Sequence, residues 1–89
     1  MDVSEILKEV KLMLNYGDND EADNNLTRFI KAIIDYAKKA GVPEAVITSE
    51  TSLDVIALGV EDLKTTKMLS DFVKSRITQL SMVTVDERL

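Results

Sequence analysis

Carboxylates crowd the start of the segment "DNDEADNNLTRFIKAIIDYAKKAG", and such a cluster raises the question of a metal site. A calcium loop needs oxygen donors at alternate positions, a glycine for its sharp turn and a glutamate that closes the coordination shell. Asp18 begins such a series, but the third donor position holds Ala22, the glycine position holds Asp23 and the closing position holds Phe29. We therefore predict that no metal binds here.

The same acidic residues suit the start of a helix. Glu21 and Asp23 lie where carboxylates accept hydrogen bonds from free backbone N–H groups and interact favourably with the positive end of the helix dipole. The apolar residues that follow recur at spacings of three and four, and the pattern stops at Gly41 and Pro43. We interpret the acidic run as the beginning of a helix over residues 21–40.

Few side chains of this chain are suited to catalysis. Histidine and cysteine are both absent, so the commonest general base and any thiol nucleophile are missing. The three glycines form no phosphate-binding pattern, and the adjacent Glu61 and Asp62 would lie on different faces of a helix. We predict a protein that is not an enzyme and that uses no cofactor and no metal.

Composition is that of a small soluble protein. The chain has 89 residues, of which 45% are hydrophobic and 30% are charged, with a net charge of −5. The acidic balance argues against direct binding to nucleic acid or to anionic lipid, since phosphate binding requires clustered Lys and Arg. No apolar run approaches the roughly 20 residues of a membrane span, and the acidic N-terminal segment is unlike a signal peptide. We expect the chain to fold in the cytoplasm, without a membrane partner.

Apolar periodicity predicts an all-α fold, a compact bundle of four main helices. Asp2 and Glu5 have the spacing of a capping box at the start of the first helix, and Thr51 and Asp54 repeat it before the third. One helical domain over residues 1–82 should then precede a flexible, extended C-terminal tail. The predicted elements are helices at 2–15, 21–40, 52–64 and 68–82, a short turn near 43–47, and the tail at 83–89. In the fourth helix the side chains predicted to face inward are Leu69, Phe72, Val73, Ile77 and Leu80.

The third predicted helix is apolar on two sides. At about 100° per residue, Val55 and Leu58 point away from the main apolar face of that helix, and Leu12 is similarly opposed to the apolar face of the first helix. In so small a protein, such a helix is either central to the bundle or covered by another subunit. The second alternative makes Leu12, Val55 and Leu58 candidate subunit-interface residues.

Arg76 lies between apolar positions of the fourth helix. Either its stem packs along them while the guanidinium reaches water, or the guanidinium pairs with a carboxylate across a subunit interface. Val83 and Val85 alternate in the tail, where they would be able to pair with an exposed edge of a neighbouring chain. These three residues complete the candidate interface.

The order of the segments along the chain is similar to that of a known protein family. A first helix ending in "VKLMLN" is followed by the acidic loop, by a long helix of the "L..FI.AI..YA" kind and finally by "LSDFVKSRITQLS", which includes the pair Gln79-Leu80. Over about residues 5–82 this arrangement resembles the small head-tail connector proteins of tailed bacteriophages. The resemblance implies an all-helical structural protein.

A connector role implies particular partners and locations. Copies of the chain would form a ring beneath the capsid portal, contact the portal and tail-completion proteins, and extend the channel through which DNA passes. DNA would pass nearby without specific binding, because an acidic surface repels phosphate. The protein would occupy the host bacterial cytoplasm first and the head–tail interface of the virion, or of a prophage particle, afterwards.

Two other functions fit the sequence. A helical protein–protein interaction module without an assigned role needs only the exposed apolar residues. The stretch "TSLDVIALGVEDL" also resembles the modification site of acyl carrier proteins, in which a serine carries the prosthetic group, and Ser52 would be that serine. Thr51 stands where carriers have aspartate, and the long helix at 21–40 occupies a region that is mostly loop in carriers.

Overall fold

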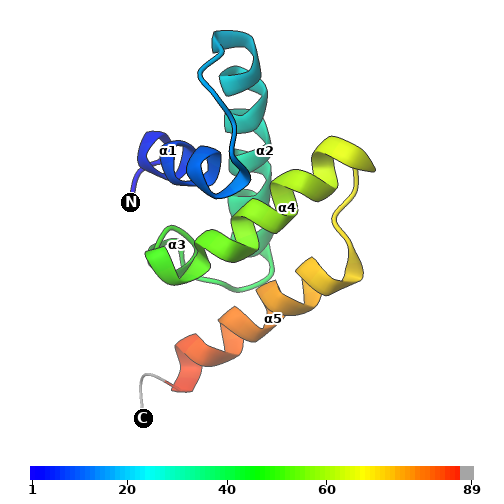
Figure 1. The fold of residues 1–89 in the computed structure, drawn as a ribbon. Coiled ribbons are helices and arrows are strands. Elements are labelled where there is room, and N and C mark those ends of the chain that lie inside the picture. Colours follow the sequence, from blue (N-terminus) through cyan, green and yellow to red (C-terminus); the bar gives the residue numbers. More distant parts are fainter. Residues whose placement is uncertain (87–89) are drawn as a thin grey trace.

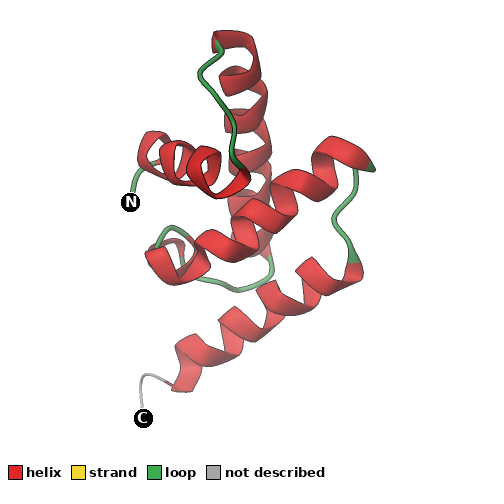
Figure 2. Cartoon of the chain, in the orientation of Figure 1, coloured by secondary structure: helices red, strands yellow, loops and turns green. Residues whose placement is uncertain are grey.

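The computed structural model describes the backbone of residues 1–86 and the side chains of residues 1–82. Within this part of the chain every regular element is a helix, which confirms the predicted all-α fold (Figures 1 and 2). Four long helices and two short helical turns follow one another. In chain order they are α1 (Val3–Leu14), α2 (Asp20–Lys39), α3 (Glu44–Ile47), η1 (Glu50–Ser52), α4 (Leu53–Thr65) and α5 (Asp71–Asp86).

The ends of α1 follow from local sequence. The predicted capping box is present, since the Asp2 carboxylate accepts from the Glu5 N–H at 2.8 Å and the Glu5 carboxylate accepts from the Asp2 N–H at 3.1 Å. Asn15 ends α1 in the left-handed conformation at φ 60°, which asparagine tolerates better than most residues.

The long helix α2 begins and ends within one residue of the predicted range 21–40. Asn19 caps it by accepting from the Ala22 N–H at 3.0 Å, and acidic side chains fill its first turn. After the last turn, Gly41 adopts φ 98°, a conformation that suits glycine because it has no Cβ. The interpretation of the acidic run as a helix start is confirmed.

The start of α4 differs from the prediction. Thr51 belongs to the 3₁₀ turn η1, its hydroxyl is hydrogen-bonded to the Ser49 hydroxyl at 2.8 Å, and α4 has no side-chain cap. The predicted capping box of Thr51 and Asp54 is therefore wrong, because the tight turn places Thr51 before the N-cap position. The short helical turn expected near 43–47 is confirmed as α3.

The boundaries of α5 are shifted toward the C-terminus. Lys67 takes the left-handed conformation at φ 63° in the connection after α4, and Ser70 accepts from the Val73 N–H at 3.3 Å as α5 begins. The helix then continues to Asp86, four residues beyond the predicted end, since each added residue gains one backbone hydrogen bond. The backbone at 83–86 is thus helical where an extended tail was predicted, and residues 87–89 lie outside the described part.

Helix α4 crosses α2 at the centre of the molecule, with α1 and α5 on either side of it (Figure 1). The crossing is close because Gly59 of α4 has no side chain: a Cβ there would lie 2.8 Å from the Cδ1 of Ile33 on α2. Helix α5 packs against α4 and α3, and its residues Val73 and Ile77 are almost fully and fully buried in the core. The core residues are Ile6, Val10, Leu26, Ile30, Ile33, Ile34, Ala37, Val42, Ile47, Val55, Ile56, Val60, Val73 and Ile77.

Candidate functional site

The structure separates the residues predicted for a subunit interface. Val55 is completely buried in the core, so the central-helix interpretation is correct for it and it cannot belong to an exposed interface. Leu58 is 42% exposed and Leu12 is 72% exposed, as interface candidates must be. The side chains of Val83 and Val85 lie outside the described residues.

Leu12 stands apart from the other exposed candidate. It lines a shallow hollow with Lys8, Lys11 and Tyr16, and every residue of that hollow belongs to α1 or to the loop that follows it. Helix α4 contributes none of them. Leu12 and Leu58 therefore mark two different surfaces.

Arg76 is paired within the chain. Its Nη2 donates to the Oδ2 of Asp54 on α4 at 3.1 Å, and both side chains stay partly exposed. Neither predicted alternative describes this arrangement fully, because the guanidinium neither ends in water alone nor requires a second subunit. The pair instead joins α5 to the outer side of α4.

Two polar contacts fix the register between α4 and α5. Asp54 pairs with Arg76, and eight residues further along α4 the Asp62 carboxylate accepts from the Ser70 N–H at 3.0 Å. Residue numbers thus rise on α4 while they fall on α5, so the two helices are antiparallel, as Figure 1 shows. Leu58 lies one turn after Asp54 on α4, and Phe72 lies one turn before Arg76 on α5. Because the two helices are antiparallel, Leu58 and Phe72 lie at the same level along the line where α4 and α5 meet, which we call the seam.

We call this surface the seam patch and define it by Leu58, Met68 and Phe72. Phe72 is 59% exposed and Met68, in the connection between the two helices, is 67% exposed. The Asp54–Arg76 pair lies one turn from Leu58 and Phe72, and Ser70, whose N–H donates to the Asp62 carboxylate, stands between Met68 and Phe72 in the chain. From their positions along two antiparallel helices and the connection between them, we infer that these side chains share one side of the molecule, and exposed apolar surface rimmed by polar groups is typical of protein–protein contact sites.

Phe72 is a residue that the sequence analysis placed wrongly. The prediction set it inward with Val73 and Ile77, but α5 turns these two toward the core and leaves Phe72 outside. A signal for this was present in the sequence. Positions 72, 75, 79 and 82 recur at helical spacing and hold Phe, Ser, Gln and Met, so α5 has a second face without charge.

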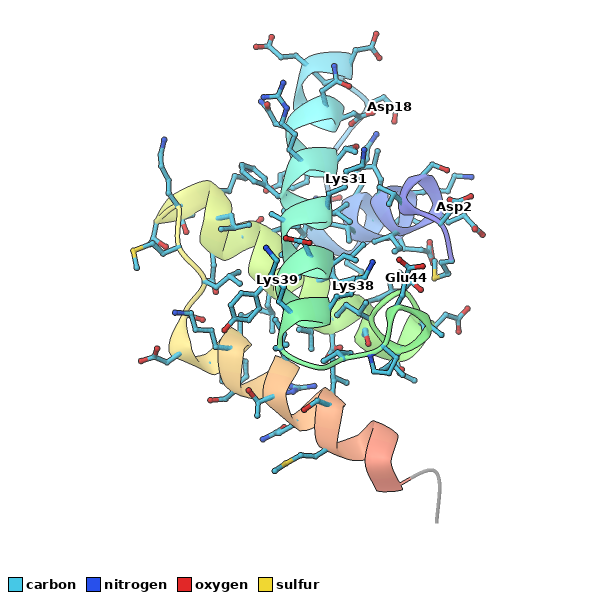
Figure 3. The ribbon with its side chains drawn as sticks, turned by 180° about the vertical axis from the view of Figure 1, so that it is seen from behind. Asp2, Asp18, Lys31, Lys38, Lys39 and Glu44 are labelled. Carbon is cyan, nitrogen blue, oxygen red and sulfur yellow. The ribbon has the colours of Figure 1, made fainter. Side chains whose placement is uncertain are left out.

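The acidic loop before α2 forms a lysine contact. The Nζ of Lys11 lies 2.8 Å from the Oδ1 of Asp18 and 3.0 Å from the Oδ1 of Asp23, which ties the end of α1 to the loop and to the first turn of α2. The hydrogen bond from Lys11 holds the pKa of the Asp18 carboxyl below its ordinary value, and the same bonds raise the pKa of Lys11. Figure 3 shows Asp18 in this loop, and further along it shows Lys38, which pairs with Glu44 of α3 at 3.0 Å.

Other kinds of site find little support among the described residues. No group of three or more acidic side chains in this part of the chain is arranged to hold a metal ion. None of its helices is both long and apolar enough to cross a membrane.

Ser52 has the wrong environment for a carrier serine. Its side chain is completely buried, and its hydroxyl donates to the Val46 carbonyl at 2.7 Å. A modifying enzyme needs an accessible hydroxyl, so the carrier alternative loses its one candidate residue.

Comparisons with protein-family models, with curated proteins and with solved structures give no match.

Proposed function

We propose that the protein is a structural component of a phage or prophage particle, a head-tail connector whose copies form a ring beneath the capsid portal. The observation that carries this proposal is the seam patch. An 89-residue domain that already buries a continuous core keeps Leu58 and Phe72 at the surface, at one level of one helix pair. Subunit contact is the role that such a surface fits best.

The order of segments over about residues 5–82 supports the connector in particular. The net charge of −5 is compatible with a channel for DNA, because an acidic wall repels phosphate and lets a duplex slide. Portal and tail-completion proteins would contact the ring at its two ends. An interaction module in some other assembly is the second candidate, since it would use the same patch.

Particle composition tests the proposal. A phage or induced prophage that lacks the gene is complemented with the wild-type protein or with Leu58→Lys. The introduced ammonium group would lie one turn from Asp54 and from Asp62, so the substitution removes apolar surface while adding favourable charge pairs to α4. We expect the variant to fold, to be at least tenfold depleted from purified particles, and to leave heads without tails.

Met13→Lys is the matched control, because Met13 is similarly exposed but lies on α1. It should be incorporated like the wild type. Absence of the wild-type protein from complete particles, together with normal tail joining in the deletion strain, would refute the connector function.

A further inference from the structure

The connection between α1 and α2, residues 15–19, separates two hollows of the surface, and we call it the strap. Figure 1 shows it running along α2 to the first turn of that helix. A groove of about 440 Å³ lies toward α2 and the end of α4, and Tyr16 and Asp18 are among its lining residues. A hollow of about 220 Å³ lies toward α1, and the same two residues line it. With open space on both sides, side-chain packing holds the strap at few points.

The backbone in the middle of the strap is also weakly held. At its start the Tyr16 N–H donates to the carbonyl of Lys11 at 2.9 Å, and after its end the Asp23 N–H donates to the carbonyl of Asn19 at 2.7 Å. Between these bonds, the Gly17 N–H donates to no carbonyl of the described chain. A Cβ at Gly17 would meet nothing within 4 Å beyond its chain neighbours. The strap is therefore fixed at its two ends and free between them.

Two side-chain contacts latch the strap to helices on opposite sides. The Tyr16 hydroxyl donates to the Oε1 of Glu61 on α4 at 2.6 Å and accepts from the Nζ of Lys64, and the Tyr16 ring packs at the edge of the core. The Nζ of Lys11 on α1 donates to the Oδ1 of Asp18 at 2.8 Å, although the Asp18 side chain is fully exposed. Exposed polar contacts of this kind contribute little stability individually.

We propose that the strap opens as one unit while the helical core stays folded, and that its opening joins the two hollows into a single apolar cleft. In the open state both latches are released. Leu7 and Leu26, which line separate hollows when the strap is closed, then line the same cleft. Segments with few packing contacts and few backbone hydrogen bonds are the ones that open below the free energy of global unfolding. This opening is independent of the proposed connector function.

Amide hydrogen exchange of the purified protein tests the opening. Ala22 and Asp23 report on the strap, because their N–H groups donate to Asn19, its last residue, at 3.0 and 2.7 Å. Ile33 is completely buried on α2 and reports on unfolding of the whole domain. Relative to intrinsic rates, we expect exchange at Ala22 and Asp23 to be at least tenfold faster than at Ile33. Low urea should accelerate only Ile33, because strap opening exposes little surface.

A substitution in the core separates strap opening from global unfolding. Ile77→Ala weakens the packing of α5 and does not touch the strap. Exchange at Ile33 should therefore rise more than tenfold, while exchange at Ala22 and Asp23 stays within twofold of the wild type. Equal acceleration at all three amides would overturn the proposal, since the start of α2 would then open only with the whole domain.

Substitutions in the latches distinguish a unit from simple fraying at the end of α2. Tyr16→Phe removes the hydroxyl that is tied to α4, and Lys11→Gln removes the ammonium group that is tied to the strap from α1. Neither side chain touches the Ala22 N–H, yet each substitution should accelerate its exchange at least threefold. The double variant should show the product of the two factors. Wild-type exchange at Ala22 in Tyr16→Phe would mean that the helix end frays by itself, and would reject the strap.

Tyr36→Phe and Lys8→Gln are the matched controls. Both side chains are exposed, and neither the Tyr36 hydroxyl nor the Lys8 ammonium is bonded to a described residue. Both variants should exchange like the wild type at Ala22.

The joined cleft has its own readout. The fluorescent dye ANS binds exposed apolar surface. The double variant with Tyr16→Phe and Lys11→Gln should raise ANS fluorescence at least threefold over the wild type, with an unchanged circular dichroism spectrum. Equal fluorescence in the two proteins would refute the cleft. Because these measurements use purified protein alone, their failure leaves the particle test of the connector unaffected.

Discussion

Val55 and Leu58 are three residues apart on α4, both are aliphatic, and their environments are opposite. Val55 is completely buried among the core residues, whereas Leu58 is 42% exposed on the seam between α4 and α5. The helix is thus surrounded on most sides and open along one strip. A residue on the buried part maintains the fold, and a residue on the open strip is available to a partner.

The largest expected effect separates these two residues directly. Val55→Asp would bury a carboxylate without a partner at a cost of several kcal/mol, in a domain whose total stability is on the order of 5–10 kcal/mol. Leu58→Asp leaves the new charge in water. We expect circular dichroism to show a largely unfolded Val55→Asp protein and a native Leu58→Asp protein. Equal loss of helicity in both proteins would contradict the assignment of Val55 to the core and of Leu58 to the surface.

Helix α5 offers the same contrast at a smaller scale. Ile77 is completely buried, and Ile77→Ala should lower the free energy of unfolding by about 2–5 kcal/mol through lost contacts and a residual cavity. Phe72→Ala removes a side chain that is 59% exposed and should change it by less than about 1 kcal/mol. Urea titrations with equal slopes would measure both values. A larger loss for Phe72→Ala would place its ring in the core.

Lowering the pH affects the polar contacts of the molecule but not its apolar core, because only the polar contacts contain groups that titrate. The pKa of Asp18 lies below its ordinary 3.8 owing to the hydrogen bond from Lys11. A carboxyl with a lowered folded pKa contributes stability that is present above the unfolded value and lost as the pH falls through the folded one. Lys11→Gln should therefore raise the Asp18 titration midpoint toward 3.8 in carboxyl NMR spectra.

Asp2 is the internal control for this titration. Its pKa is lowered by the Glu5 N–H, which Lys11→Gln does not touch, so its midpoint should stay where it is in the wild type. An unchanged Asp18 midpoint in the variant would mean that the lysine contact does not form in solution.

The smallest effect is expected at the ion pair that lies one turn from Leu58 and Phe72. Asp54 and Arg76 are both partly exposed, and such pairs contribute only about 0–1 kcal/mol. Arg76→Met should leave the free energy of unfolding within that range, as measured by urea titration. A loss near that of Ile77→Ala would show that the pair, and not the apolar face of α5, holds this helix in place.

Local signals in the sequence were sufficient for most helix ends. The capping box of Asp2 and Glu5, the left-handed Asn15 and the glycine after α2 all act within a few residues of where they stand. The capping-box spacing of Thr51 and Asp54 gave a wrong prediction, because Thr51 lies in a 3₁₀ turn before the N-cap position of α4. A cap motif predicts a helix end only where the preceding chain can enter the helix directly.

The candidate site was predictable only in part. Leu58 and Arg76 were recognised from helical periodicity, and the structure places both along the α4–α5 seam. Phe72 was assigned to the wrong face, because its neighbours Val73 and Ile77 lie within the same apolar arc of the wheel. Asp54 became part of the site only through its contact with Arg76, which is 22 residues away.

The sequence by itself determined the all-α class, the positions of the main helices and the two-sided character of α4, since each depends on spacing along the chain. Only the tertiary structure decided which apolar side of a helix is buried. That choice depends on where the other helices cross: Gly59 lets α2 approach one side of α4, and the Asp54–Arg76 pair sets α5 along another. Leu58 remains exposed because no segment of the described chain covers the strip between them.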